Sequence, residues 1–355
     1  MGEPSVLLLN NHPLHSGNPG QVEALQFMAG NNEIGEVSIL NAGPRADETQ
    51  QQRDLRVIQG IRDSRSDVIL ALSLKGLIRD MERVQQAVAG RTLIYWEGDA
   101  WGPRKPVGPE MAAWLAMADH VFSVGGSPQV ELLQASGAGT VHHTIHTYDH
   151  VLFADSERGD WAAPDAEIVF IGSHLSKVLL VSGLPGSAGR WRLVRSLKRR
   201  YREDFLVAGA GWPKGVSIGR VDFGEQDRFI QRARLLVNWD HYADVEAYTS
   251  DRLAIAMIAG RAQVTTSHPG MQWLPGPESG LYLESSVGGV IRRTAELLNG
   301  PAESLAGRGR AAHAWARKRI SHREALRHML STVFPEIERP PADPWDALPG
   351  PWPPS

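Results

Sequence analysis

Residues 234–271 carry the pattern that most restricts the fold of this chain. The apolar run 235–237 (LLV) is short enough to be a strand that is buried on both faces. A polar loop comes next, followed by a helix that opens on a Thr-Ser-Asp capping sequence and ends at Gly260, and by a second strand over 262–266. This unit is typical of parallel α/β sheets, where ligands bind at the carboxyl ends of strands and helix N-termini hold anions. The loop 238–252 is therefore the first predicted phosphate site.

The same alternation of short apolar strands and helices repeats along the 355 residues. Helices alternate with the predicted strands, which lie near 6–9, 37–40, 67–72, 92–96, 120–124, 167–172, 205–208, 235–237, 262–266 and 280–283. We predict an α/β protein with two Rossmann-like, doubly wound parallel-sheet domains facing a cleft, the GT-B arrangement. The domains are expected over 1–153 and 165–335, joined by a charged linker, with a Pro-rich extended or disordered arm over 339–355.

Composition excludes several classes of partner and chemistry. The net charge of -3 does not favour a nucleic-acid surface or an anionic membrane as the main partner. The absence of cysteine removes disulfides, thiolate catalysis and zinc–thiolate sites. Without an apolar run of about 20 residues or a signal-peptide pattern, a cytoplasmic protein without integral membrane association is expected. Nothing in the sequence indicates an oligomeric state.

The loop after the first predicted strand carries polar side chains and glycines suited to a hydroxyl-rich or phosphorylated ligand. Asn11 and Gly17 are candidate acceptor-binding residues, and His12 and His15 are candidate general bases because a histidine titrates near working pH. The alternative is that these histidines only bind loop backbone.

Two carboxylates end the fourth predicted strand in the sequence WEGDAW. Glu97 and Trp101 are candidate acceptor-binding residues, and Asp99 is a third candidate base, since carboxylates orient sugar hydroxyls or accept a proton. The aromatic flanks Trp96 and Trp101 would suit a sugar-binding wall. Alternatively, Asp99 caps a turn, as Asp often does beside glycine.

In the second half, candidate donor-binding residues follow the predicted strands. Main-chain N–H groups at Gly172 and Ser173, together with Lys177, would clamp a diphosphate, and Gly211 and Trp212 would frame a base. A solvated loop and a tight strand-end turn are the alternatives. No P-loop and no GxGxxG fingerprint occurs, which removes the usual signatures of ATPases and dehydrogenases.

The loop of the opening pattern completes the predicted donor site. It begins at Asn238 and presents Tyr248, Thr249 and Ser250 at a helix N-terminus, with Arg252 one turn in. Helix dipole, hydroxyl donors and an arginine fork together make a pyrophosphate site, and helix capping with a solvated Arg252 is the alternative. A metal site is not expected at the histidine group His142, His143, His146 and His150, which lacks a carboxylate at helical spacing.

These motifs resemble glycosyltransferases of the GT-B fold (glycosyl transferase family 1/4-like), nearest the group with the glycosyltransferase domain of spore-maturation proteins. The resemblance rests on Phe170-Ile171-Gly172-Ser173, on the Ser250-Asp251-Arg252 helix start with its small-residue helix, on the strand ending Val264-Thr265-Thr266, and on His322-Arg323. It covers roughly residues 165–330 well, and the first half only in layout.

The resemblance implies a nucleoside-diphosphate sugar bound mainly by the second domain, a small-molecule acceptor bound mainly by the first, and no essential metal or other cofactor. One position departs from the family, because Ile255 stands where relatives usually have a Glu that holds the donor ribose. Ribose contacts would then come from elsewhere, such as Glu246 or Asp244.

The expected activity is that of a metal-independent glycosyltransferase in specialised metabolism. A sugar-nucleotide epimerase of the same fold and a non-catalytic nucleotide- or sugar-binding protein remain alternatives. The sugar, the nucleotide, the acceptor and the stereochemistry are open.

Overall fold

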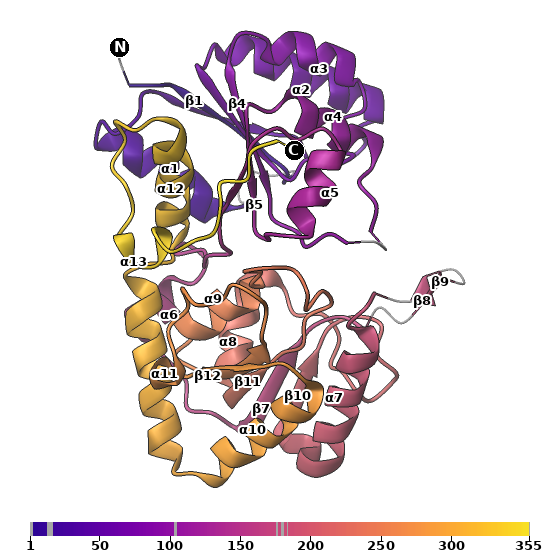
Figure 1. Cartoon of the computed structure of the whole chain (residues 1–355), viewed down its shortest axis with the longest axis vertical. Coiled ribbons are helices and arrows are strands. Elements are labelled where there is room, and N and C mark those ends of the chain that lie inside the picture. Colours follow the sequence, from indigo (N-terminus) through magenta and orange to yellow (C-terminus); the bar gives the residue numbers. More distant parts are fainter. Residues whose placement is uncertain are drawn as a thin grey trace. The chain divides into compact units, whose positions relative to one another are not determined.

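The computed structural model describes residues 3–12, 17–102, 105–174, 177–178, 181–182 and 184–354. The chain forms two compact units (Figure 1). Unit 1 comprises Met1–Ile145, Glu246–Tyr248 and His322–Ser355, and unit 2 comprises His146–Val245 and Thr249–Ser321.

Unit 1 is built on a six-stranded parallel sheet in the order β2-β1-β3-β4-β5-β6. Its strands are β1 (Val6–Asn10), β2 (Val37–Asn41), β3 (Val68–Leu72), β4 (Thr92–Glu97), β5 (His120–Ser123) and β6 (Val141–His143). Its helices are α1 (Pro19–Gly30), α2 (Gln50–Ser64), α3 (Met81–Val88), α4 (Pro109–Met117), α5 (Gln129–Ala135), α12 (His322–Val333) and α13 (Ala342–Trp345). The runs VLLLN and VILAL of β1 and β3 are wholly buried, as central strands covered on both faces should be.

Unit 2 is built on a five-stranded parallel sheet in the order β10-β7-β11-β12-β13. Its strands are β7 (Ala166–Ile171), β10 (Phe205–Ala208), β11 (Ala233–Val237), β12 (Ala262–Thr266) and β13 (Leu281–Glu284), with a small antiparallel pair of β8 (Lys177–Val178) and β9 (Val181–Ser182). Its helices are α6 (Ala154–Arg158), α7 (Ser187–Tyr201), α8 (Gln226–Gln231), α9 (Asp251–Ile258), α10 (Val287–Asn299) and α11 (Ala302–Arg317). The two parallel sheets confirm the predicted α/β class.

Each sheet has one point where the strand order reverses, and ligands of open α/β sheets bind at the carboxyl ends of the strands there. In unit 1 this switch point lies between β1 and β3, and in unit 2 between β7 and β11. The loops that leave these four strands are therefore the ones to inspect for function.

The unit boundaries differ from the predicted 1–153 and 165–335. Helix α12 lies beside α1 in unit 1, because its apolar side chains Leu326, Met329 and Leu330 share one buried cluster with the sheet (Figure 1). The side chain of Arg327 also pairs with Glu33, at 2.6 and 3.0 Å.

Two further segments differ from the sequence interpretation. The linker contains the short helix α6. The Pro-rich tail packs on unit 1 instead of forming a free arm: Trp345 is buried, and Trp352 exchanges two backbone hydrogen bonds with Val141 on the edge strand β6, at 2.8 and 3.0 Å.

Candidate functional site

In unit 2, a buried arginine spans the switch point. Arg190, in the first turn of α7, donates from Nε to the carbonyl of Trp239 at 2.6 Å and from Nη1 to the carbonyl of Ser173 at 3.1 Å. Ser173 follows β7 and Trp239 follows β11, so one guanidinium fixes the two loops against each other. The predicted donor residues Gly172, Ser173 and Asn238 thus lie at one edge of the sheet.

A buried acid–histidine pair lies in the loop after β11. Asp240 accepts a hydrogen bond from Asn238 Nδ2 at 2.9 Å, and its Oδ2 lies 3.1 Å from Nε2 of His268. The other ring nitrogen of His268 lies 3.1 Å from the carbonyl of Val245. Although burial works in the opposite direction, the hydrogen bond and charge of His268 hold the pKa of Asp240 at about 2. The pair ties the loop 238–250 to the end of β12.

The next residue, His241, links the pair to the predicted phosphate ligand. Burial, together with the charges of Arg190 and Arg252, lowers the pKa of the His241 ring to about 3. Neither of its ring nitrogens has a hydrogen-bond partner in the described part of the chain. The charges of Arg190 and Arg252 thus both act on His241, against that of Asp240, and positive charge here suits an anionic ligand.

Helix α9 begins beside this cluster with Ser250 as its N-cap. The side chain of Ser250 makes no capping hydrogen bond, contrary to the expectation of ordinary capping, and Asp251 instead accepts from the backbone N–H of Arg252 at 2.9 Å. Thr249 and Ser250 are buried, whereas the predicted ligand Tyr248 is assigned to unit 1.

Three nearly parallel aromatic rings adjoin the loop after β7. The ring of His174 stacks on those of Trp212 and Trp191, at centroid distances of 4.8 and 5.3 Å. Trp212 donates from Nε1 to the carbonyl of Gly172 at 2.8 Å, so this predicted base-framing residue is held beside the predicted phosphate loop. Gly211 has a φ of 79° and a backbone too close to His174 for a side chain. Lys177 begins β8, and its side chain lies outside the described residues.

Glu246, one of two possible ribose ligands, belongs to unit 1 in the structure. Its backbone N–H donates to the carbonyl of Ser127 at 2.8 Å, and its carbonyl accepts from Gly126 at 2.8 Å. Asp244 is exposed in unit 2. Ile255 is fully buried in α9.

In unit 1, the end of β1 organises the first predicted loop. The buried side chain of Asn10 donates to the carbonyl of Gly17 at 2.9 Å and accepts from the backbone N–H of His12 at 3.2 Å. A Cβ at Gly17 would lie 1.9 Å from Cγ of His12, so only glycine permits this approach. Asn11 is partly exposed and His12 exposed, whereas His15 lies outside the described residues.

The carboxylates predicted at the end of β4 have different surroundings. Glu97 is fully buried, with its Oε1 accepting from the backbone N–H of Asp99 at 2.9 Å, and burial raises its pKa. Asp99 is half exposed and binds Lys75 and Lys105. Burial alone would raise the pKa of Asp99, but these two lysines hold it at about 2. The Trp101 ring packs beneath them.

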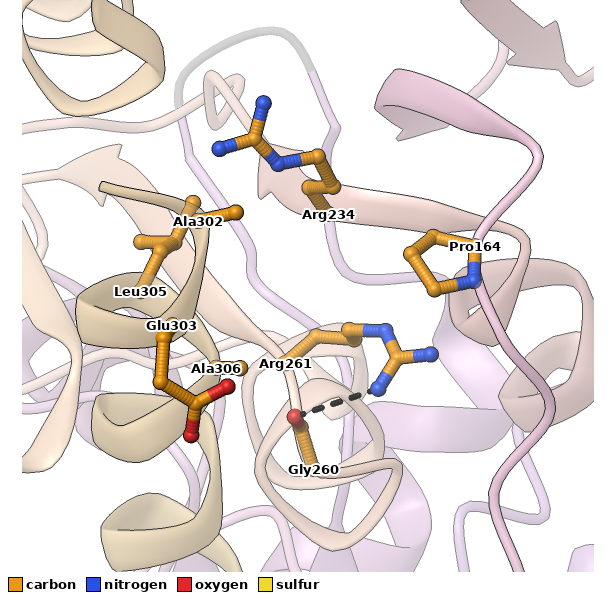
Figure 2. A pocket seen from close by; sticks show the side chains of 8 residues that line it. All are labelled: Pro164, Arg234, Gly260, Arg261, Ala302, Glu303, Leu305 and Ala306. Carbon is orange, nitrogen blue, oxygen red and sulfur yellow. Dashed lines mark hydrogen bonds between the residues drawn. The ribbon is translucent and has the colours of Figure 1, made fainter. Parts of the chain in front are cut away.

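Unit 2 also has a cavity of about 250 Å³, and Figure 2 shows the side chains that line it. It is at the amino ends of the strands, lined by Pro164, Arg234, Gly260, Arg261, Ala302, Glu303, Leu305 and Ala306. Arg234 is paired with Glu167 at 2.6 Å, and Arg261 donates to the carbonyls of Ala233 at 2.8 Å and Gln231 at 2.7 Å. The arginines of this cavity therefore have structural partners. The predicted donor site lies at the opposite, carboxyl ends of the strands.

Four residues of the unit 2 cluster were missed from sequence: Arg190, Asp240, His241 and His268. Asp240 and His241 lie near the start of the loop after β11, and the rule that ligands bind at the carboxyl ends of strands could have indicated them. Arg190 and His268 reach the site only through the packing of α7 and of the loop after β12, and no local motif marks them. Among the residues that the structure describes, no group of three or more His, Asp or Glu side chains could hold a metal ion.

Comparisons with known proteins agree with this architecture. Residues 190–331 match the family model described as Glycosyl transferase-like. No curated protein matches the chain by sequence. In the part of this chain that the structure describes, no helix is long and apolar enough to cross a membrane.

Three solved structures have similar folds over nearly their whole length. HepE from Anabaena, in complex with UDP and glucose, has a TM-score of 0.58 at 12% identity, covering 94% of this chain and 99% of HepE. An α-glucosyltransferase in complex with UDP and a 13-mer DNA has a TM-score of 0.64 at 10% identity, covering 95% and 100%. Sucrose-phosphate synthase from Thermosynechococcus elongatus has a TM-score of 0.57 at 12% identity, covering 94% and 99%. The chain has the GT-B fold of these enzymes.

Proposed function

We propose that the chain is a glycosyltransferase that transfers a sugar from a nucleoside-diphosphate sugar to a small-molecule acceptor, without a metal. The observation that carries the proposal is the cluster of Arg190, Arg252 and His241 at the switch point of unit 2, beside the N-terminus of α9. The glycosyl transferase-like match over 190–331 supports the same reading. UDP, which HepE binds, is the first nucleotide to test.

In the proposed reaction, an acceptor oxygen attacks the anomeric carbon of the sugar. The bond from that carbon to the diphosphate oxygen breaks, and the nucleoside diphosphate leaves with the bonding electrons. Arg252, Lys177 and the amides at 248–250 would offset the charge on the leaving group, with Arg190 adding to the positive field. If the reaction inverts the anomeric centre, His12, His15 or Asp99 takes the acceptor proton.

The second candidate function is that of a non-catalytic nucleotide- or sugar-binding protein, and Ile255 supports it. Its side chain is fully buried and offers no oxygen to a ribose, so the contact usual in related enzymes is missing. An epimerase of the same fold would use the same nucleotide cluster without net sugar transfer.

The test combines nucleotide binding with turnover in the full-length protein. Thermal shift with UDP and other nucleoside diphosphates, in magnesium and in EDTA, should give a metal-independent rise in Tm for one of them. Arg252→Ala should abolish that rise, whereas Arg292→Ala, a control at an exposed arginine of α10 in the same unit, should retain it.

Turnover separates the three candidates. A transferase releases nucleoside diphosphate only when an acceptor is present, an epimerase isomerises the donor without release, and a binding protein does neither. Failure of every nucleoside diphosphate to raise Tm would refute the proposed function.

A further inference from the structure

Two lysines in unit 1 converge on a single carboxylate oxygen. The ammonium groups of Lys75 and Lys105 both bind Oδ2 of Asp99, the latter at 3.0 Å. Lys75 also lies 3.8 Å from Oε1 of the buried Glu97, and Lys105 donates to the carbonyl of Ala100 at 3.1 Å. Burial works against charge on Lys75, but the carboxylates of Glu97 and Asp99 raise its pKa overall.

The two ammonium groups retain hydrogen-bonding capacity. Each has three N–H donors, and among the described residues Lys75 has one hydrogen-bond acceptor and Lys105 has two. The side chains are about one-third exposed, at 36% and 33%. Lys75 faces both Glu97 and Asp99, whereas Lys105 faces Asp99. The partly exposed ammonium groups therefore have N–H donors left for a further acceptor.

An aromatic ring supports both cations. Nζ of Lys105 lies 4.2 Å from the centroid of the Trp101 ring, and Nζ of Lys75 lies 5.8 Å from it. The backbone N–H of Trp101 donates to Gln129 Oε1 at 3.0 Å, and Gln129 donates to the carbonyl of Asp99 at 3.0 Å. These bonds fix the Trp101 backbone, and with it the ring beneath the lysines, near the end of β4.

The loop that presents Lys75 has an unfavourable backbone conformation. Ser73 and Lys75 have φ values of 39° and 45°, in the left-handed region that non-glycine residues seldom adopt. Such strain persists where surrounding contacts enforce it, and it concentrates at functional sites. Here Ser73 Oγ donates to the carbonyl of Trp96 at 3.1 Å and accepts from the backbone N–H of Gly98 at 2.9 Å.

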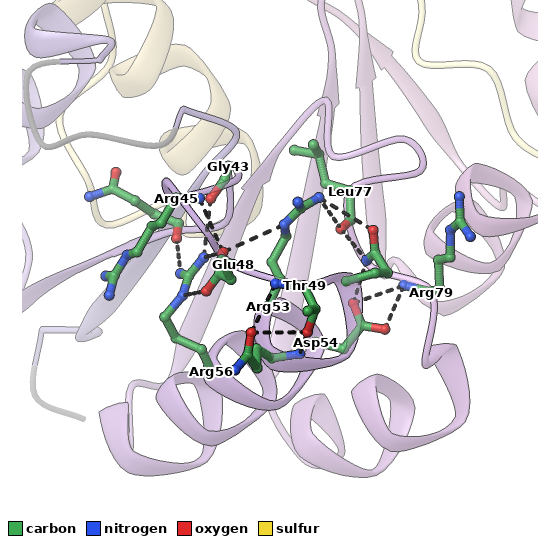
Figure 3. A network of polar contacts seen from close by, with 12 residues as sticks. Gly43, Arg45, Glu48, Thr49, Arg53, Asp54, Arg56, Leu77 and Arg79 are labelled. Atoms are coloured by element: carbon green, nitrogen blue, oxygen red, sulfur yellow. Dashed lines mark hydrogen bonds and ion pairs between the residues drawn. The ribbon is translucent and has the colours of Figure 1, made fainter.

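Helix α2 holds the other side of the same loop. Figure 3 shows Asp54 and Arg53 of this helix reaching the backbone at Leu77 and Arg79. The carboxylate of Asp54 accepts from the backbone N–H groups of Arg79 at 3.3 Å and Asp80 at 3.2 Å. Contacts on both sides therefore fix this loop, and the backbone of Lys75 is preorganised without a ligand.

We propose that Lys75 and Lys105, over Trp101, form a binding subsite for an anionic group, and that the acceptor carries a carboxylate or a phosphate. This inference rests on the proposed function, because it takes the carboxyl edge of unit 1 as the acceptor site. Asp99 occupies the subsite in the absence of ligand and competes with the incoming anion.

Isothermal titration of the full-length protein with glucose, glucuronate and glucose 6-phosphate provides the test. Both anions should bind more tightly than glucose. Tighter binding of glucuronate would indicate a carboxylate on the acceptor, and tighter binding of glucose 6-phosphate would indicate a phosphate. Lys75→Met and Lys105→Met should each reduce the preference roughly fivefold, which corresponds to about 1 kcal/mol for a partly exposed ion pair. Lys318→Met, at an exposed lysine after α11, should leave it unchanged.

Asp99→Asn should change the affinity for the anion in the opposite direction. A gain in affinity cannot result from an unfolded variant. Removal of the competing carboxylate should strengthen anion binding severalfold if the lysines form a subsite, whereas lysines that only hold Asp99 would give no gain. Equal binding of the three sugars, or an unchanged preference in the folded double lysine variant, would overturn the inference. UDP binding by the same samples separates this failure from failure of the proposed function: intact UDP binding without anion preference refutes the subsite alone.

Discussion

At the scale of single residues, His268 has the greatest structural consequence in unit 2. One ring nitrogen lies 3.1 Å from the carbonyl of Val245, and the other lies 3.1 Å from the carboxylate of Asp240. His268 therefore anchors the loop 238–250 behind the proposed diphosphate site.

We expect His268→Ala to lower the free energy of unfolding by about 3 kcal/mol, because removal of one partner leaves the other charge buried and unpaired. Urea unfolding measures this, and UDP affinity should fall in parallel. Asp240→Asn, which removes the buried charge but keeps a polar partner, should cost less. A loss below about 0.5 kcal/mol for His268→Ala, the range of a surface substitution, would contradict this role.

Asp99 illustrates how surroundings decide between candidate bases. With a pKa of about 2 it stays ionised but has little tendency to accept a proton. If a histidine and not Asp99 is the base, we expect kcat/KM to fall along an acid limb as the pH decreases between 9 and 4, because Asp99 alone would stay ionised over that range. Steady-state rates from pH 4 to 9 check this. The limb should disappear in a variant of the responsible histidine, and a rate that stays constant down to pH 4 would favour Asp99.

Sequence alone could place Glu97, Asp99 and Trp101 at the end of a strand, because the apolar run of β4 is recognisable. It could not identify Lys75, which follows a different strand and meets Asp99 only after β3 and β4 pair. Arg190 is hidden for the same reason: its partners Ser173 and Trp239 are 17 and 49 positions away in the chain. Local patterns predict strand ends, and tertiary packing decides which side chains share them.

At the scale of elements, two helix starts make a matched comparison. Helix α2 has a full capping box, in which Thr49 and Gln52 exchange hydrogen bonds with each other's backbone N–H. Helix α9 has Ser250 at its N-cap without such a bond. The capping box stabilises the start of α2, whereas the hydroxyl at the start of α9 makes no capping hydrogen bond and lies at the proposed anion site.

Thr49→Ala should lower the free energy of unfolding by about 1 kcal/mol without changing nucleotide affinity. Ser250→Ala should have a smaller effect on stability but weaken nucleotide binding. Chemical unfolding and UDP titration of both variants test the pair. The reverse result, with Ser250→Ala destabilising the fold and sparing binding, would show that Ser250 serves only its helix.

Most long elements were predictable, because apolar runs such as those of β1, β3 and β4 have few alternatives. Strand β6 could be read only as a short strand-like segment, since two of its three residues are histidines. Short helices such as the six-residue α8 also lack enough turns to display a periodic face.

At the scale of the whole molecule, buried histidines of unit 1 should make stability depend on pH. Burial, aided by the charge of His328, lowers the pKa of His143 to about 3, and burial with His120 and His328 lowers that of His142 to about 4. An unfolded chain takes up these protons below about 6.5, whereas the folded chain does not. Stability is therefore fully present above pH 6.5 and is lost as pH falls toward 4.

For His143 alone, the loss between pH 7 and pH 5 should be about 2 kcal/mol. Guanidinium unfolding at the two pH values measures it, and His143→Met should reduce the difference by that amount. An equal pH dependence in the variant would assign the effect to other groups.

The division of the chain between units was the part of the fold least accessible from sequence. A periodic helix such as α12 shows that it has an apolar face, but not which core that face joins. The ion pair of Arg327 with Glu33 joins residues almost 300 positions apart, a distance that no local rule bridges.

That arrangement has a consequence for the order in which the protein is made. Unit 1 contains both ends of the chain, so its core side chains Val6 and Leu8 have been synthesised long before Leu326 and Met329, which cover them. A ribosome adds roughly 5–20 residues per second, so the first sheet waits tens of seconds for its last helix, while unit 2 can fold in between. The nascent first sheet is thus the stage most exposed to chaperones and to misassembly, and this stage lasts until α12 has been synthesised.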